Sequence, residues 1–289
     1  MEDIKAIDVM NYLFTPEAKK QYFDSDEYAF ATRRLRGGKR EQLTPAMYPS
    51  AMEFVAYMDE AGYEKVFITA WKMFSWANKR LQVNNTIEQV YEQVKMAPER
   101  LVGVAGYNPL KIQESLQEIE TAVKECGFKY VYFHSLSFGL ALNDKKLYPC
   151  YAKCAELGIP VGMQVGHAAE NLPSEGGRPI YLDEVALDFP NLKIIASHTG
   201  WPWVDELVAM AMKHENIYCD ISAWPPEMLP AMHAPLLRFI DTRIGREKTL
   251  WGSNGRGMKE YREQFLALPL REDTKSKILR ENAIALFGL

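Results

Sequence analysis

Residues 189–224 read FPNLKIIASHTGWPWVDELVAMAMKHENIYCDISAW, and they contain the pattern on which the fold prediction rests. The short β-branched runs at Lys193–Ser197 and Ile217–Ile221 are typical of buried strands. Between them, VDELVAMAMKH at residues 204–214 repeats apolar side chains at helical spacing and predicts a helix. A helix that separates two buried strands is the sequence pattern of a parallel βαβ unit.

The same alternation runs through the rest of the chain. Amphipathic segments such as IQESLQEIETAVKEC at 112–126 separate further strand-like runs. These additional strands are predicted at Ile4–Val9, Lys65–Thr69, Leu101–Ala105, Lys129–Phe133, Pro160–Gln164 and Thr249–Gly252. Eight such units predict a closed (β/α)8 barrel, with an open doubly wound sheet as the alternative. No GxGxxG motif follows the first strand, which disfavours a dinucleotide-binding form of that alternative.

Length and composition narrow the class of protein. Neither a linker nor a low-complexity tract nor an internal repeat divides the 289 residues, so we expect one domain over 1–289. The net charge of −4 disfavours nucleic acid as a partner, because phosphate binding needs a basic surface. No apolar run approaches the roughly 18 residues of a membrane span, and MEDIKAID lacks a secretory-signal pattern. We therefore expect a cytoplasmic protein with reduced thiols at Cys126, Cys150, Cys154 and Cys219.

Three long connections follow predicted strands, at residues 14–46, 70–85 and 166–179. In a barrel they would lie over the mouth, where the catalytic groups of this architecture gather. The basic run Arg33–Arg40 inside the first of them is expected to be a solvated face. The C-terminal segment 275–289 has an amphipathic pattern and is expected to form a helix that covers the barrel.

Several segments together resemble one family. They are GFKYVYFHS, LYPCYAKCAELGIPVGMQVGH, the stretch 189–224, LWGSNGRG and ILRENAIALFGL. They are similar to the amidohydrolase-2 family, the branch of the amidohydrolase superfamily typified by aminocarboxymuconate-semialdehyde decarboxylase, over essentially the whole chain. The resemblance implies a distorted TIM barrel with its site at the C-terminal ends of the strands. It also implies a small-molecule substrate, often an aromatic or unsaturated acid, and a homodimer.

The family's metal-binding pattern is largely missing. Most members hold one divalent metal with a His-x-His pair after strand one, histidines after strands five and six, and an aspartate after strand eight. Here Met10 and Tyr12 stand at the His-x-His positions, Gln164 at the strand-five histidine and Asn254 at the aspartate, while His198 matches the strand-six histidine. Zinc and similar ions need several imidazole, thiolate or carboxylate ligands. We therefore predict no metal and no cofactor; a weak site formed by His198 and neighbouring histidines is the alternative.

Acid–base chemistry must then come from histidine or tyrosine, because an amide at position 254 does not titrate near neutral pH. His198 is the predicted general acid/base, and His167 is a predicted proton shuttle or second polar contact. Tyr12 would direct its hydroxyl at the substrate, the alternative being a core aromatic that fills the barrel. Asn254 would hold a substrate oxygen.

Other side chains near the strand ends are expected to bind the substrate. Tryptophans predict an aromatic-walled cavity, and an arginine can clamp a carboxylate through two hydrogen bonds. For His134 a structural role is as compatible with the pattern as a catalytic one. The predicted binding residues are Met10, Trp71, Trp76, His134, Gln164, Arg178, Trp201, Trp224 and Arg256. His214 and His233 lie in helical patterns and are expected at the surface.

These features predict a metal-independent hydrolase, C–C lyase or isomerase that acts on a small cyclic or aromatic anion. Fixed hydrogen-bond donors can stabilise developing charge without an ion, so loss of the metal leaves catalysis feasible. The alternative is a catalytically inactive barrel that binds a small ligand or an active homologue.

Overall fold

The computed structural model describes residues 4–35 and 47–289, with side chains for 4–31 and 47–289. Eight parallel strands form one sheet in the order β1-β2-β5-β6-β7-β8-β9-β10. They are β1 Ala6–Tyr12, β2 Tyr63–Thr69, β5 Leu101–Ala105, β6 Tyr130–Phe133, β7 Val161–Gln164, β8 Ile194–Ser197, β9 Ile217–Asp220 and β10 Thr249–Leu250. All eight predicted strands are confirmed, although β1 runs past Val9 to Tyr12.

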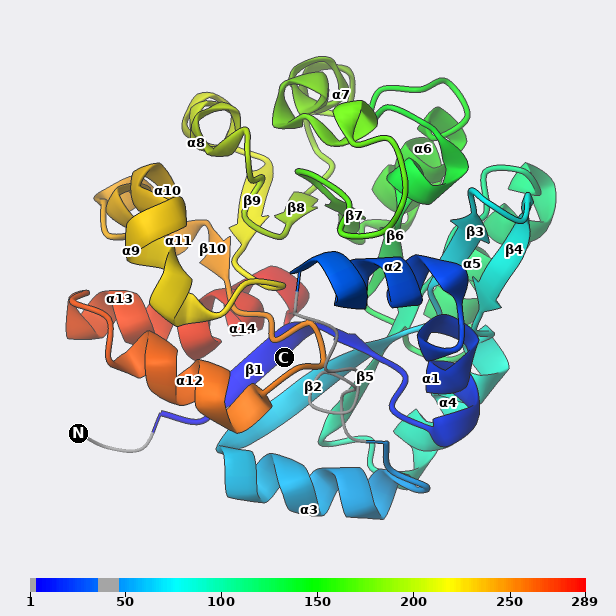
Figure 1. The fold of residues 1–289 in the computed structure, drawn as a ribbon, viewed down its shortest axis with the longest axis horizontal. Coiled ribbons are helices and arrows are strands. Elements are labelled where there is room, and N and C mark those ends of the chain that lie inside the picture. The colour runs from blue at the N-terminus through cyan, green and yellow to red at the C-terminus, as the bar shows by residue number, and fades with distance from the viewer. Residues whose placement is uncertain (1–3, 36–46) are drawn as a thin grey trace.

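The sheet curves round until its last strand meets its first. The backbone N–H of Val9 donates to the carbonyl of Trp251 at 2.9 Å, and that of Asn254 donates to the carbonyl of Met10 at 2.9 Å. These two bonds join β1 to the chain that follows β10, so the strands form a nearly closed ring (Figure 1). The predicted (β/α)8 TIM barrel is confirmed, and the open sheet was the wrong alternative.

Helices surround the barrel (Figure 1), and local sequence signals set their ends. Thr15 caps α1 by accepting a hydrogen bond from the Ala18 N–H, and Thr86 and Gln89 form a capping box at the start of α4. The helices are α1 Pro16–Phe23, α2 Asp26–Leu35, α3 Ala51–Ala61, α4 Ile87–Met96, α5 Ile112–Lys124, α6 Tyr148–Leu157, α7 Leu182–Asp188, α8 Val204–Lys213, α9 Leu229–Met232, α10 Ala234–Ile240, α11 Arg243–Glu247, α12 Met258–Leu266, α13 Glu272–Ser276 and α14 Asn282–Phe287. A π-helical segment, Lys277–Glu281, joins the last two.

The C-terminal helix fills one end of the barrel. Phe287 of α14 packs against Phe67 and Tyr130, with ring centroids 4.7 Å and 5.3 Å apart. Tyr130 is the first residue of β6, so α14 occupies the end at which the strands begin. The mark of the C-terminus lies next to β1 in Figure 1. The expected covering helix is confirmed, and the opposite end of the barrel, where the strands finish, is the one that is left for a site.

Two of the three connections expected over the mouth contain regular structure. The first contains α1 and α2, and the second forms an antiparallel hairpin of β3 (Lys72–Ser75) and β4 (Arg80–Asn84). The third, residues 166–179, has only short 3-10 turns. The side chains of the basic run Arg33–Arg40 lie outside the described residues.

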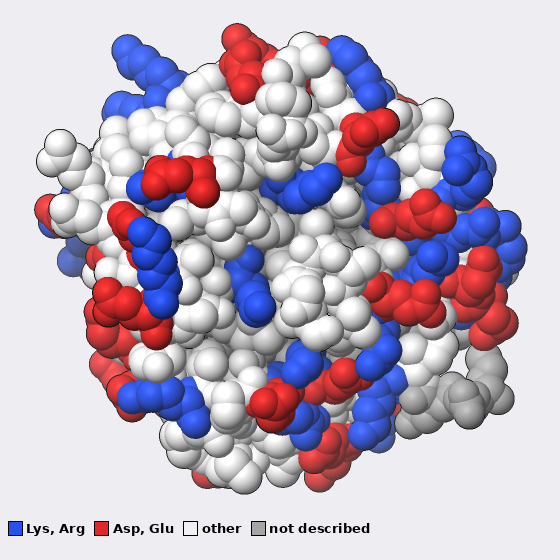
Figure 2. Space-filling view, turned by 180° about the vertical axis from the view of Figure 1, so that it is seen from behind, with Lys and Arg blue, Asp and Glu red and all other residues white. Residues whose placement is uncertain are grey.

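Charges of both signs are mixed over the surface. Figure 2 shows Lys and Arg interspersed with Asp and Glu on the face opposite to that of Figure 1. Ion pairs at the surface, such as Arg100 with Asp59 at 2.7 Å, contribute little to stability because water screens them. The four cysteines form no disulfide. In the described part of the chain, no helix has the length and apolarity that crossing a bilayer requires.

Candidate active site

A cavity of about 380 Å³ lies at the end of the barrel where the strands finish. The side chains that define its chemistry are Tyr12, Tyr22, Trp71, His134, Gln164, His167, Glu170, His198, Trp201, Trp224, Asn254 and Arg256. The structure thus brings together ten of the thirteen predicted site residues, although they come from seven strand ends far apart in sequence. The volume of the cavity and its mixed aromatic and polar wall are typical of a small-molecule site.

Unusual backbone geometry is concentrated at this cavity. Four described non-glycine residues have positive φ, and three of them line the cavity: His198 at 75°, Ala223 at 73° and Asn254 at 57°. The left-handed conformation costs a side-chain-bearing residue on the order of 1 kcal/mol and persists only where the surroundings hold it. The strand ends therefore hold these residues in place at the expense of local backbone strain.

His198 directly follows β8 and is buried. Its Nδ1 lies 2.7 Å from the hydroxyl oxygen of Ser222, which leaves Nε2 on the other side of the ring. Burial, together with smaller repulsion from His134 and His167, lowers the pKa of His198 to about 3. The imidazole is therefore neutral near pH 7, and a neutral imidazole can accept a proton.

The other two histidines in the wall have different surroundings. Nδ1 of His134 accepts a hydrogen bond of 3.1 Å from the backbone N–H of Ser137, so its neutral ring carries hydrogen on Nε2. That Nε2 lies 4.0 Å from Oε2 of Glu170. His167 packs edge-on against Trp201, with ring centroids 4.8 Å apart. Burial lowers the pKa of both histidines.

Glu170 was not singled out from the sequence. It belongs to the turn-forming connection 166–179, and it is the one carboxylate in the part of the wall that the described residues form. The hydroxyl of Tyr22, in α1, donates a hydrogen bond of 2.5 Å to its Oε1. The available signal was an acidic residue among turn formers in a predicted mouth loop, but no spacing rule distinguishes an inward from an outward side chain there.

Three polar side chains close the cavity between β1 and β10. The ring of Tyr12 lies against that of Trp71, with centroids 4.6 Å apart; burial and then Glu170 raise its pKa, so the phenol stays protonated and can donate. The side-chain oxygen of Asn254 is buried and accepts no hydrogen bond from the described residues. No carboxylate among the described side chains lies within ion-pair distance of the Arg256 guanidinium, so this cation is available to an anionic ligand.

A buried acid anchors the loop that carries Asn254 and Arg256. Asp8 accepts hydrogen bonds from the backbone N–H of Ser253 at 3.0 Å, from the Ser253 hydroxyl and from the Asn11 side chain at 2.9 Å. Burial raises the pKa of Asp8 to about 7, although these hydrogen bonds act in the opposite direction. Asp8 thus joins β1 to the segment after β10 beneath the cavity.

Three predicted binding residues lie away from the cavity, which corrects the expectation for them. Met10 is fully buried and belongs to an apolar cluster that includes Phe67 and Tyr132. Trp76 is 38% exposed in the β3–β4 hairpin and lies under Lys79, whose Nζ is 3.8 Å from the ring centre. Arg178 forms ion pairs with Glu206 and Glu175 instead of facing a ligand.

The expectation that His214 and His233 lie at the surface is wrong. His214 is buried and its Nε2 lies 2.6 Å from Oδ1 of Asp183. His233 is completely buried against the Trp224 ring, 4.9 Å between centroids, and burial lowers its pKa to about 4. Neither residue lies within a helix: His214 directly follows α8, His233 lies between α9 and α10, and tertiary packing covers both side chains.

The family's divalent metal does not fit the residues present. Among the described residues no group of three or more His, Cys, Asp or Glu side chains is placed to hold an ion. The side-chain nitrogen of Gln164 donates to the carbonyl of His167 at 3.3 Å, and Met10 does not reach the wall. A protonated phenol and an amide at Tyr12 and Asn254 are poor partners for zinc or manganese.

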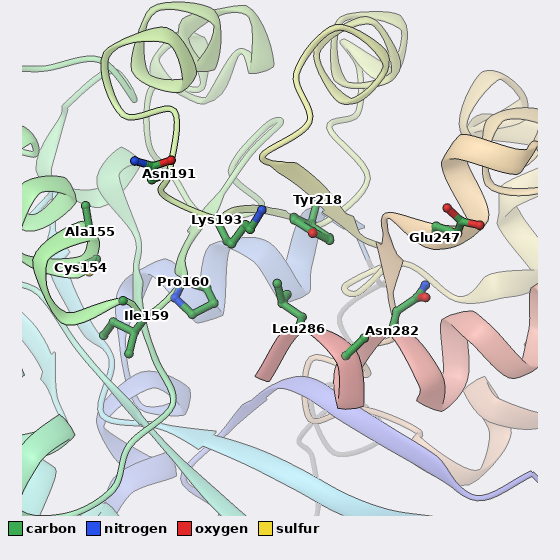
Figure 3. A pocket seen from close by; sticks show the side chains of 12 residues that line it. Cys154, Ala155, Ile159, Pro160, Asn191, Lys193, Tyr218, Glu247, Asn282 and Leu286 are labelled. Atoms are coloured by element: carbon green, nitrogen blue, oxygen red, sulfur yellow. The ribbon is translucent and has the colours of Figure 1, made fainter. Parts of the chain in front are cut away.

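A second cavity of about 330 Å³ lies at the opposite end of the barrel (Figure 3). Residues at the starts of β7, β8 and β9 line it together with α14, among them Lys193, Tyr218 and Asn282. Lys193 is exposed, and the Asn282 side chain is occupied by the carbonyls of Arg246 and Thr249. TIM-barrel enzymes place their chemistry at the other end, so the cavity with the histidines is the candidate active site.

Comparison with known proteins shows the family of the chain. Residues 39–289 match the sequence model of the amidohydrolases. An uncharacterised TIM-barrel protein of Bordetella bronchiseptica is 26% identical over 98% of both chains, with a TM-score of 0.78. A dihydroxybenzoic acid decarboxylase of a Polaromonas species, solved with manganese and an inhibitor, is 17% identical over 99% of this chain and 97% of that one, with a TM-score of 0.68.

A probable 2-pyrone-4,6-dicarboxylic acid hydrolase of Acinetobacter baumannii is 15% identical over 99% of this chain and 100% of that one, with a TM-score of 0.63. At these identities the decarboxylase and the hydrolase show the shared barrel alone. The match of the family model covers most of the sequence, from the segment before α3 to the last residue. The chain belongs to the amidohydrolase family.

Proposed function

We propose that the protein is a hydrolase that cleaves a small cyclic or aromatic ester or amide bearing a carboxylate, without a bound metal. The observation that carries this proposal is the neutral imidazole of His198 in the same cavity as Arg256, which no described carboxylate pairs. A neutral histidine can take a proton from water, and an arginine can hold a carboxylate. Membership in a family of enzymes, with decarboxylases and a hydrolase of ring acids among the solved relatives, supports catalysis on a ring acid.

In the proposed reaction Nε2 of His198 removes a proton from water while the water oxygen attacks the carbonyl carbon. A carbon–oxygen bond forms and the carbonyl oxygen gains negative charge. The Tyr12 hydroxyl and the Asn254 side-chain N–H donate hydrogen bonds to this oxygen, and each such donor is worth roughly 3 kcal/mol in a preorganised site. The imidazolium then gives its proton to the leaving oxygen or nitrogen as the bond to carbon breaks, which restores neutral His198.

Arg256 favours hydrolysis over decarboxylation. A guanidinium stabilises a carboxylate, whereas the CO2 formed in decarboxylation is neutral. Arg256 would therefore stabilise the substrate more than the transition state of decarboxylation, which would raise the activation barrier. In hydrolysis the carboxylate stays intact, and Arg256 binds it equally before and after the chemical step. The solved decarboxylase relative contains manganese, and the described donor set here does not suit that ion.

Metal analysis and a hydrolysis screen test the proposal. We expect chelator-treated protein to contain no stoichiometric transition metal and to hydrolyse carboxylate-bearing cyclic esters at an unchanged rate. His198→Gln should lower kcat by about 100-fold or more. His214→Gln changes a buried histidine outside the cavity and should leave kcat unchanged. Activity that is lost on chelation and restored by zinc would overturn metal independence, and binding without product throughout the screen would favour the inactive barrel.

A further inference from the structure

The ends of β8 and β9 bring a buried acid, a hydroxyl and a histidine close together. β8 finishes at Ser197, immediately before His198, and β9 finishes at Asp220, two residues before Ser222. Nδ1 of His198 lies 2.7 Å from the Ser222 hydroxyl oxygen. The backbone N–H of Ser222 donates to Oδ1 of Asp220 at 2.7 Å, which fixes the serine beside the carboxylate.

The Asp220 carboxylate is isolated from solvent and from cations. Asp220 and Ser222 are both fully buried, and no described Lys or Arg lies within ion-pair distance of Asp220. Burial raises the pKa of Asp220 to about 6, and the hydroxyl groups of Ser222 and Ser197 act against that rise. Oδ2 of Asp220 accepts no hydrogen bond from the described residues. A hydroxyl hydrogen is therefore the strongest stabilisation that the surroundings offer this anion.

Close packing restricts the side chains of Asp220 and Ser222. A Cβ added at Gly252, in the segment after β10, would lie 2.9 Å from Oδ1 of Asp220 and 2.9 Å from the Cβ of Ser222. Real Cβ atoms do not approach other atoms so closely, so only glycine fits against these two side chains. The acid and the serine accordingly have little room to rotate away from His198.

The single hydrogen of the Ser222 hydroxyl can point in only one direction. If it points to Nδ1 of His198, the ring carries its own hydrogen on Nε2 and presents a donor to the cavity, while the buried carboxylate is left without the hydroxyl. If it points to Asp220, Nδ1–H donates to the serine oxygen, and the lone pair of Nε2 faces the cavity. A charge-assisted hydrogen bond to a buried anion is stronger than one to a neutral imidazole, which favours the second arrangement.

We propose that Asp220, acting through the Ser222 hydroxyl, is a positioning residue that fixes neutral His198 in the tautomer with hydrogen on Nδ1, so that Nε2 is free to act as a base. The consequence for turnover rests on the proposed function. The tautomer itself does not, because it is a property of the free protein. Chain segments that end two neighbouring strands thus supply a base and the group that orients it.

Nitrogen-15 NMR of the full chain, labelled at histidine, tests the tautomer. The chain has five histidines, and His198→Gln identifies the signals of His198 by their loss. Burial lowers the pKa of His198, so at about pH 8 its ring is neutral, and its pattern should be that of an Nδ1–H ring. Asp220→Asn and Ser222→Ala should shift it toward Nε2–H. His134, whose Nδ1 accepts from a backbone N–H, is an internal reference and should show Nε2–H in every variant.

Two outcomes would overturn the proposal: an Nε2–H ring for His198 in the wild-type protein, or an unchanged ring in both variants while circular dichroism shows them folded. With a substrate in hand, kcat should fall about 10-fold or more in Asp220→Asn with KM nearly constant, and Ser222→Thr should recover more activity than Ser222→Ala. If no substrate is turned over but the tautomer is as expected, the proposed function fails and this inference stands. Full turnover by Asp220→Asn alongside loss in His198→Gln would refute the inference alone.

Discussion

The hydroxyl of Tyr22 donates a hydrogen bond of 2.5 Å to Oε1 of Glu170. This bond links α1, which precedes the second strand, to the loop after β7, so two of the mouth connections meet across the cavity. The other oxygen of Glu170 lies 4.0 Å from Nε2 of His134. Glu170 therefore orders three parts of the wall at once: a helix, a loop and the end of β6.

Replacing this acid should impair the site more than the fold. Glu170→Gln keeps the shape of the side chain but weakens the bond to Tyr22 and removes the charge near His134, so we expect kcat/KM to fall about 10-fold and stability to fall by about 1 kcal/mol. Steady-state kinetics and urea unfolding measure the two effects. Glu175→Gln, in the same loop but largely exposed, is the matched control and should change neither. Equal effects of both substitutions would show that Glu170 has no special place in the site.

Removal of the cavity's available cation should affect binding more than chemistry. For Arg256→Gln we expect KM for a carboxylate substrate to rise about 10-fold to 100-fold with a smaller change in kcat, because a charged hydrogen-bonded pair is lost in the ground state and the transition state alike. A neutral methyl-ester analogue should bind both proteins equally. Arg243→Gln, an exposed arginine of α11, is the control. A larger loss in kcat than in KM would assign Arg256 to the chemical step instead.

The buried acid beneath the site predicts a pH dependence of stability. The pKa of Asp8 is raised from 3.8 to about 7 in the folded state, so the folded protein binds more protons than the unfolded chain between about pH 4 and pH 7. Its contribution to stability is therefore present at low pH and is lost as pH rises through about 7. Between pH 5 and pH 8 the wild type should lose on the order of 2 kcal/mol relative to Asp8→Asn, which does not titrate.

Urea unfolding of both proteins at the two pH values measures that difference, because every other titrating group is common to them and cancels. A difference that stays constant with pH would mean that Asp8 is ionised throughout this range. The sign matters as well: a wild type that gains stability relative to Asp8→Asn on going to pH 8 would require a lowered pKa, contrary to its complete burial.

Gly252 should tolerate no side chain. A Cβ there would lie 2.8 Å from the Cβ of Met10 and 2.9 Å from both Asp220 and Ser222, so Gly252→Ala should destabilise the protein by about 1–3 kcal/mol and reduce kcat. Gly288→Ala is the control, since its φ is +62° but nothing lies within 4 Å of an added Cβ. That variant should cost about 1 kcal/mol through backbone strain and leave kcat unchanged. Thermal melts and steady-state kinetics of the two variants measure these effects. Equal losses of stability and of kcat in both variants would contradict the prediction that contacts at Gly252 exclude a side chain.

The sequence predicted the positions of the strands well because the signal is local. In the run KIIAS, the successive residues Ile194, Ile195 and Ala196 are apolar on both faces of a strand, which is typical of a buried parallel strand. Once the barrel was inferred, residues that follow strands were expected to converge. His198, Asn254 and Arg256 do line one cavity, although their roles in catalysis remain predictions.

The sequence did not predict the direction of side chains in the mouth connections. Trp76 and Arg178 lie in connections that were correctly assigned to the mouth, yet one packs under Lys79 and the other pairs with Glu206. Glu170, in the same kind of loop, points inward. Loop backbones have no fixed period, so the face on which a side chain lies is set by partners elsewhere in the chain.

The barrel could be predicted from the sequence, because residue type and local spacing mark each strand and helix. The expected position of the site follows from the barrel architecture. The replacement of metal ligands by a thioether, a phenol and two amides follows from the resemblance to the family. Only the tertiary structure decided which acids support the site, because Asp8 meets Ser253 and Glu170 meets Tyr22 across much of the chain. Asp220 lies close to Ser222 in sequence, but the burial of Asp220 and the contact between Ser222 and His198 are properties of the closed barrel.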